Sequence, residues 1–166
     1  MPSPSLIKQL RDILILPFTV TVIVPILVHN KDRLFLSDNI VIRIIGFILS
    51  AGGLCLFFYT VYLFNAFGKG TLAPWAPTQK LIILGPYKYC RNPMITGVLF
   101  ILAGESLVMH STNIAIWAVA FFLINTTYFI LLEEPSLQKR FGEDYQVYKI
   151  HVPRWIPRIR PYNGKL

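Results

Sequence analysis

Charged residues are scarce in this sequence, and their scarcity argues against most soluble folds. Only 14% of the 166 residues are Asp, Glu, Lys or Arg, whereas 54% are hydrophobic. A soluble domain usually carries about 25% charged residues. The composition therefore favours a protein whose apolar side chains face lipid, and the length is that of a single domain.

Cysteines and catalytic signatures are also scarce. The two cysteines, Cys55 and Cys90, indicate neither a disulfide framework nor a metal site. His29, His110 and His151 are scattered along the chain. The sequence has no Gly-x-Gly-x-x-Gly, no Walker loop, no His-Glu-x-x-His and no Gly-x-Ser-x-Gly. Metal chemistry and a catalytic triad are thus unsupported, and we expect no metal partner.

Long apolar segments, in contrast, are abundant, and they predict an all-α, polytopic membrane protein that forms one domain over residues 1–166. A helix needs about 20 residues to cross a bilayer, so the third segment is barely long enough and the second can tilt. Lys8 and Arg11 precede the first segment as in a secretion signal, but no small-residue cleavage site follows, so we expect a retained span. The predicted spans are residues 13–29, 40–67, 94–110 and 113–132.

The positive charges predict the orientation of these spans. The net charge is +8, and Lys and Arg gather before the first span, in residues 68–93 and in residues 133–166. The link between the third and fourth spans has none. By the positive-inside rule, both termini and the two basic regions are cytoplasmic. We attribute the basic charge to an anionic leaflet, so no nucleic-acid partner is expected.

A basic, aromatic turn opens the third span: Gly85-Pro-Tyr-Lys-Tyr-Cys-Arg-Asn-Pro-Met94. Pro93 suits the first turn of a helix, and Asn92 is a preferred N-cap. The helix start would present free N–H groups and the positive end of its dipole to a carboxylate or hydroxyl. The simpler interpretation is an ordinary helix start with Arg91 reaching the interface.

Two adjacent acids, Glu133 and Glu134, stand where the fourth span ends. Acids at this depth are unfavourable unless they are paired or solvated. They suit a hydroxyl-rich or cationic ligand, or else an ion pair with Lys88 or Arg91. An antiparallel hairpin places them at the same end as the basic turn. Glu105 would lie roughly 22 Å from Glu133 along the helix, so we expect it to be structural and near the outer face.

Aromatic side chains accompany both clusters, and two interpretations of them remain open. They could stack on a flat ring of a ligand, or they could form the aromatic belt of a membrane interface. The tail after residue 133 has apolar residues at helical spacing, which predicts a helix that Gly142 interrupts and that ends before Pro153. The aromatic residues are Tyr87, Tyr89, Tyr145, Tyr148 and Trp155.

Four blocks occur in an order and at a spacing that resemble a known superfamily. They are the 85–94 turn, Glu133-Glu134-Pro135, Phe141-Gly-Glu-Asp-Tyr-Gln-Val-Tyr148 and Val152-Pro-Arg-Trp-Ile-Pro157. Over about residues 68–158 the chain resembles the isoprenylcysteine carboxyl methyltransferase and phospholipid methyltransferase superfamily. The resemblance implies S-adenosylmethionine-dependent methyl transfer to a membrane lipid or other amphiphilic acceptor, either a phospholipid amine or an isoprenylcysteine-like carboxylate or thiol. The alternative is a catalytically inactive membrane subunit that retains the fold.

The resemblance also implies a cofactor site, from which this sequence departs at three positions. Asn92 and Ile95 stand where the carboxyl-methylating branch has histidine and tyrosine, and Phe129 stands where it has a substrate-binding arginine. The absent guanidinium disfavours a carboxylate acceptor. No residue is identified as a catalytic base. The implied cofactor-binding residues are Gln79, Lys80, Leu81, Ile82, Tyr87, Arg91, Asn92, Pro93, Met94, Ile95, Glu133 and Glu134.

Overall fold

Helices are the regular elements of the described chain, as the all-α prediction requires. The computed structural model describes residues 14–29, 39–68 and 80–164. Labels with η mark π-helices, except η3, which is a 3-10 helix. The elements are η1 (Leu14–Ile23), α2 (Val24–Val28), α3 (Ile40–Leu63), η2 (Phe64–Gly68), η3 (Gly85–Lys88), α4 (Pro93–Val108), α5 (Thr112–Tyr128), η4 (Phe129–Glu133) and α6 (Glu134–His151).

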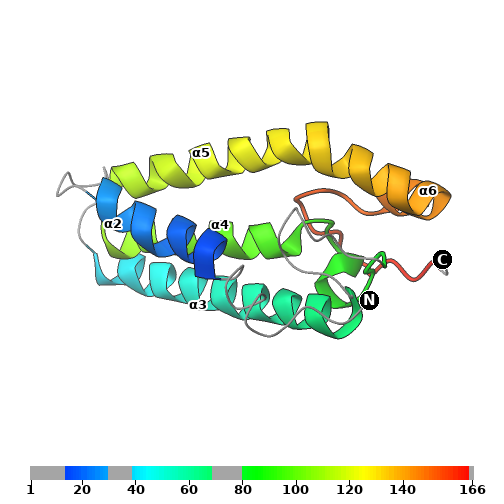
Figure 1. Cartoon of the computed structure of the whole chain (residues 1–166). Helices are drawn as coiled ribbons and strands as arrows, with labels where there is room; N and C mark the ends of the chain where they lie inside the picture. The colour runs from blue at the N-terminus through cyan, green and yellow to red at the C-terminus, as the bar shows by residue number, and fades with distance from the viewer. Residues whose placement is uncertain (1–13, 30–38, 69–79, 165–166) are drawn as a thin grey trace.

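Successive long helices run antiparallel, with α3 and α4 side by side and α5 continuing through η4 into α6 (Figure 1). At one end of the bundle, the Asn113 side chain donates a 3.0 Å hydrogen bond to the carbonyl of Val28. At the same end, Arg43 donates a 3.3 Å hydrogen bond to His110. The end of α2, the start of α3 and the α4–α5 turn therefore meet there. The functional candidates lie at the opposite end.

Glycines let α3 and α4 approach closely. A Cβ atom on Gly53 would lie 2.6 Å from the carbonyl oxygen of Gly97, and one on Gly104 would meet the carbonyl of Gly46. Small residues at such a seam are typical of helix contacts in membranes. Of the Gly52-Gly53 pair, only Gly53 is a packing position, because a Cβ on Gly52 would meet nothing within 4 Å. The helix α3 passes through both without interruption.

Two of the described helices are long and apolar enough to cross a membrane. They are Ile40–Leu63 and the continuous helix Thr112–His151. Both expose large apolar side chains, such as Ile48 at 66% and Ile124 at 60%. The helix α4 has 16 residues, and the first helical segment is shorter still. The two long helices support a membrane protein, while spanning by all four segments stays a prediction.

The chain folds back after α6. Gly142 has φ 55° and ψ −127°, which breaks the helical geometry of α6 where a break was predicted. The helix ends at His151, before Pro153. Residues 152–162, which we call the C-terminal strap, then return along the 85–91 turn (Figure 1). Backbone hydrogen bonds of 2.9–3.0 Å join the two, from Arg91 to Pro153, from Arg158 to Tyr89 and from Tyr162 to Lys88.

Candidate functional site

A cavity of about 330 Å³ lies where α4 begins and where α5 gives way to α6. Its lining residues come from η1 through to α6, so distant parts of the sequence meet there. The wall contains both polar and apolar side chains, which we call its polar part and its apolar part. The polar part is Arg91, Asn92, Asn125, Glu133, Glu134 and Arg140, and the apolar part includes Leu16, Pro17, Val20, Phe57, Val98 and Phe121.

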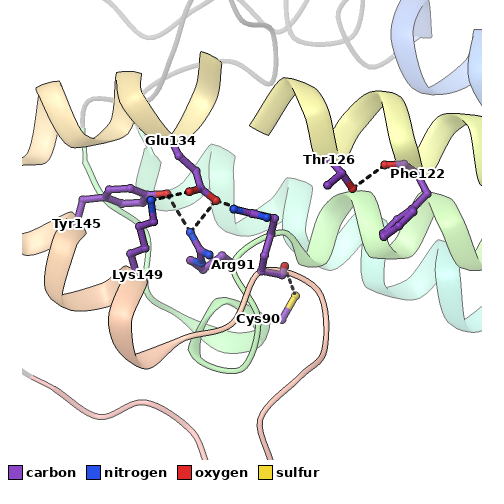
Figure 2. Close-up of polar contacts among 8 residues, drawn as sticks. Cys90, Arg91, Phe122, Thr126, Glu134, Tyr145 and Lys149 are labelled. Atoms are coloured by element: carbon purple, nitrogen blue, oxygen red, sulfur yellow. Dashed lines mark hydrogen bonds and ion pairs between the residues drawn. The ribbon is translucent and has the colours of Figure 1, made fainter. Parts of the chain in front are cut away.

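Glu134 is the electrostatic centre of the polar part. Its side chain is 6% exposed, and one carboxylate oxygen accepts hydrogen bonds from Arg91 at 2.9 Å and from Arg154 at 2.7 Å. The other oxygen lies 2.8 Å from the Lys149 ammonium. Figure 2 shows Arg91 and Lys149 reaching this carboxylate, and Arg91 also donates a 3.3 Å hydrogen bond to the hydroxyl of Tyr145. We call Glu134 with Arg91, Lys149 and Arg154 the Glu134 clamp.

The clamp keeps Glu134 ionised and joins three parts of the chain. Burial opposes the charge of Glu134, but the hydrogen bonds from Arg154 and Lys149 and the charge of Arg91 outweigh burial and lower its pKa to about 2. Because Arg91 precedes α4 and Arg154 lies in the C-terminal strap, the clamp fixes both against α6. Cations contact both carboxylate oxygens of Glu134. This agrees with the interpretation from sequence in which one of the two acids forms an ion pair with Arg91.

Glu133 has a different environment from its neighbour. Its side chain is 30% exposed, and Arg140 approaches only to 3.9 Å. The hydroxyl of Tyr128 donates a 3.4 Å hydrogen bond to the second carboxylate oxygen. Both contacts are longer than those of Glu134. Of the two acids lining the cavity, Glu133 is therefore the one that a ligand can reach without displacing a tightly bound cation.

Asn92 occupies the N-cap position of α4, but the predicted side-chain cap is wrong. Its ψ angle of 53° departs from the extended backbone that an N-cap residue usually adopts, and its side chain makes no capping hydrogen bond. Its carbonyl instead accepts hydrogen bonds from the backbone N–H and hydroxyl of Thr96. Asn92, Met94 and Ile95 line the cavity, whereas the buried Pro93 does not.

Three of the five predicted aromatic residues line the cavity: Tyr87, Tyr145 and Tyr148. The hydroxyl of Tyr148 donates a 2.7 Å hydrogen bond to the carbonyl of Tyr87. Burial raises the pKa of all three hydroxyls, so they stay protonated and form a neutral aromatic wall. Tyr89 lines a separate outer groove, and Trp155 packs on aromatic rings of α5 and η4.

The segment before the turn contributes two of its four predicted site residues to the cavity. Leu81 and Ile82 line it, and Ile82 is buried. Lys80 is exposed and does not line the cavity. Gln79 lies outside the described residues.

The structure adds three lining residues with polar groups that the sequence prediction did not assign to the site: Arg140, Asn125 and Tyr128. Arg140 follows Glu133 by seven positions, a spacing that puts both on one face of a helix and could have identified it. Asn125 lines the cavity, and its side-chain amide donates a 2.8 Å hydrogen bond to the carbonyl of Phe121 in its own helix. Glu105 lies near the far end of α4, away from this cavity.

Comparison with known proteins identifies one family. The sequence matches the family model described as phospholipid methyltransferase over residues 41–144. The matched range contains all but the first residue of α3, the 85–91 turn, α4, α5 and the start of α6, and with them most of the cavity wall. Comparison with curated proteins gave no match.

Proposed function

We propose, because the chain belongs to the phospholipid methyltransferase family, that it transfers a methyl group from S-adenosylmethionine to a lipid or other amphiphilic acceptor at the membrane. The family implies a methyltransferase with a lipid-like substrate. The choice of cofactor, the site residues and the membrane topology are part of the proposal.

The observation that supports this function best is that one cavity is lined by both polar and apolar side chains. Its volume lies within the roughly 300–1,000 Å³ that is usual for small-molecule sites. A polar, cationic methyl donor and an apolar acceptor chain need these two environments side by side. We place the donor at the polar part and the acceptor chain along the wall formed by η1, α3, α4 and α5.

The polar lining offers the charged and hydrogen-bonding groups that S-adenosylmethionine would need. The partly exposed Glu133 carboxylate suits ribose hydroxyls or a cationic group, and the start of α4 beside Asn92 suits a carboxylate. The ring of Tyr87, or that of Tyr145, would face the adenine. Glu134 lines the same cavity, but we assign it to the structure of the site because three cations already surround its carboxylate.

The bound cofactor would supply an electrophilic methyl group, and the chain would supply position and exclusion of water. Methyl transfer by in-line displacement depends mainly on holding the acceptor atom close and aligned. Neither histidine nor cysteine is among the described residues that line the cavity. The three lining tyrosines outside the spans keep their protons. We therefore assign no base and attribute catalysis to positioning.

The proposal also includes the orientation of the molecule. Four spans with both termini on the cytoplasmic side would put the polar part of the cavity at the cytoplasmic surface, where S-adenosylmethionine is available. The acceptor would enter sideways from the bilayer with its chain in lipid. The distribution of Lys and Arg supports this orientation.

Cofactor binding tests the proposal and separates it from the alternative of an inactive subunit. Titration of S-adenosylmethionine into the protein in neutral detergent should show binding by calorimetry. Glu133→Gln should weaken it about 10- to 100-fold, because it removes a charge-assisted hydrogen bond worth about 1.5–3 kcal/mol. Glu143→Gln makes the same charge change at an exposed position of α6 and should bind as the unmodified protein does.

Two results would count against the proposal. An unmodified protein that does not bind S-adenosylmethionine would favour the inactive subunit. Equal binding by Glu133→Gln and the unmodified protein would show that the role assigned to Glu133 is wrong.

A further inference from the structure

We infer that the C-terminal strap is a membrane-binding surface, in which Ile156 and Ile159 enter the bilayer while Arg158 and Arg160 bind the head groups of anionic lipids. The partner is the anionic leaflet of the same bilayer that holds the helices of the chain. This inference rests on the membrane orientation in the proposed function. It does not depend on the cofactor or on the methyl acceptor.

Two isoleucines of the strap are left almost uncovered by the rest of the protein. Ile156 is 80% exposed and Ile159 is 98% exposed. The segment that carries them is held in place, because the backbone N–H of Arg158, which lies between them, donates a 3.0 Å hydrogen bond to the carbonyl of Tyr89. Transfer of two such side chains from water to an apolar environment is favourable. The strap therefore presents apolar surface that an apolar partner would cover.

The neighbours of Ile156 place it at the level of the predicted spans. On one side, the ring of Trp155 lies 5.2 Å from that of Phe122 and 5.9 Å from that of Phe129, both in the fourth predicted span. On the other side, Pro157 lines the outer groove together with residues of α3 and α4. In the proposed orientation the strap thus reaches the edge of the apolar layer, where the exposed Ile156 side chain meets lipid.

The charge of this part of the chain has one sign. Residues 145–164 contain four Lys or Arg residues and neither Asp nor Glu. Two of the four bind the Glu134 carboxylate in the clamp. Of the other two, Arg158 donates a 2.9 Å hydrogen bond to the carbonyl of His151, a partner without charge, and Arg160 is exposed. Basic residues next to exposed apolar side chains are complementary to an anionic bilayer surface.

Two aromatic residues that do not line the cavity support a lipid partner over a protein partner. Tyr89 lines the outer groove and Trp155 packs on the fourth predicted span, and both residue types gather at membrane interfaces. An acidic protein would match the charge of the strap equally well. However, a protein that approaches from the cytoplasm would not reach Ile156 at the level of the spans.

The depth of the strap tests the contact in the whole protein. With both cysteines replaced by serine, one fluorescent label would be attached at Ile156→Cys, Ile159→Cys, Glu143→Cys or Val119→Cys in nanodiscs of phosphatidylcholine and phosphatidylserine in equal parts. Labels at 156 and 159 should be quenched by lipids brominated in their chains and shielded from aqueous iodide. The label at Glu143, exposed on α6, should show the reverse. The label at Val119, 59% exposed on α5, reports a lipid-facing span.

The choice of brominated lipid tests the role of charge. A basic residue near an anionic surface favours it about fivefold, so quenching at residue 159 should give a relative affinity for phosphatidylserine over phosphatidylcholine of about 30-fold. Arg160→Gln should lower this preference to about fivefold, and addition of Arg158→Gln should abolish it. Lys139→Gln, an equal charge change at an exposed position of α6, should leave it unchanged. An unchanged thermal unfolding midpoint for Arg160→Gln shows that the variant is folded.

Three results would overturn the inference. They are a label at residue 156 or 159 that behaves like the label at Glu143, equal affinity for the two lipids without the arginine substitutions, and a preference for phosphatidylserine that survives loss of both arginines.

The control at Val119 and a measurement of donor binding keep this inference separate from the proposed function. Lipid quenching at Val119 but not at the strap contradicts the inference alone. Absence of lipid quenching at both contradicts the proposed membrane orientation as well. Lipid quenching at the strap of a protein that does not bind S-adenosylmethionine contradicts the proposed function and leaves the strap contact in place.

Discussion

Removing the charge of Glu134 should loosen the contact between the start of α4 and the C-terminal strap. Glu134→Gln leaves Arg91, only 10% exposed, beside Arg154 and Lys149 without their shared carboxylate. Removing one partner of a buried ion pair usually destabilises by about 3–5 kcal/mol. The lowered pKa, from 4.5 to about 2, corresponds to about 3 kcal/mol at neutral pH and agrees with the lower end of that range.

Cys90 provides the assay for this prediction. It is 2% exposed, and its thiol donates a 3.6 Å hydrogen bond to the carbonyl of Arg154, so opening of the strap would uncover it. Replacing the exposed Cys55 by serine leaves Cys90 as the single thiol. With a thiol-reactive dye in detergent, Glu134→Gln should raise the labelling rate of Cys90 about 100-fold, the equivalent of about 3 kcal/mol.

Glu133→Gln is the matched control for this experiment. The side chain of Glu133 is 30% exposed and its ion pair is 3.9 Å long, so its loss should change stability by less than about 1 kcal/mol and labelling by less than about tenfold. Equal labelling rates in the two variants would refute the reasoning that separates the roles of the adjacent acids.

Two further predictions concern acid stability and helix packing. Because the pKa of Glu134 is lowered to about 2, the stability that it contributes is fully present above about pH 4.5 and is lost as the pH falls toward 2. The thermal midpoint of the unmodified protein should therefore fall further between about pH 6 and pH 3 than that of Glu134→Gln, and equal falls would contradict this assignment. Gly53→Ala should destabilise by about 1–3 kcal/mol, because its Cβ would lie 2.6 Å from the Gly97 carbonyl oxygen. Gly52→Ala has open space at the same depth and should be neutral or stabilise by up to about 1 kcal/mol in the same melts; a similar loss in both variants would rule out the glycine seam.

Much of the fold could be predicted from the sequence, because the length of an apolar run and the position of turn residues determine where a helix forms and where it ends. The long apolar runs became helices, Gly142 broke the tail helix, and α6 ended before Pro153. The turn before α4 and the acids after α5 meet at one end because a short connection forces two successive helices to be antiparallel. The contact between Arg91 and Glu134 confirms this arrangement.

The detailed site could not be predicted, because it depends on contacts between distant residues. Glu133 and Glu134 are adjacent in sequence, but only the folded tail brings Lys149 and Arg154 to Glu134. The N-cap prediction for Asn92 failed because the backbone there takes a ψ angle that sequence preference does not reveal. Arg140 could be predicted to lie near Glu133, because it follows the acid by seven residues and shares its helical face.

The contribution of the first helical segment to the cavity was also not foreseen. Leu16, Pro17 and Val20 line the apolar part, more than a hundred residues before the acids. The indole N–H of Trp117 donates a 3.1 Å hydrogen bond to the carbonyl of Val20, which ties this segment to α5. Amphipathic patterning gives little guidance here, since lipid and protein interior are both apolar surroundings for a helix.

The central claim is that donor and acceptor meet in this cavity. It is tested most directly by measuring methyl transfer in a variant whose cavity is filled by a larger side chain. S-adenosylmethionine with a labelled methyl group and a total lipid extract would be incubated with the unmodified protein, with Ile95→Trp and with Val119→Trp. Ile95 lines the cavity, whereas Val119 is 59% exposed on the outer face of α5. We predict label in the lipid fraction for the unmodified protein and Val119→Trp, and none for Ile95→Trp. Equal labelling by Ile95→Trp, or no labelling by the unmodified protein, would contradict the account.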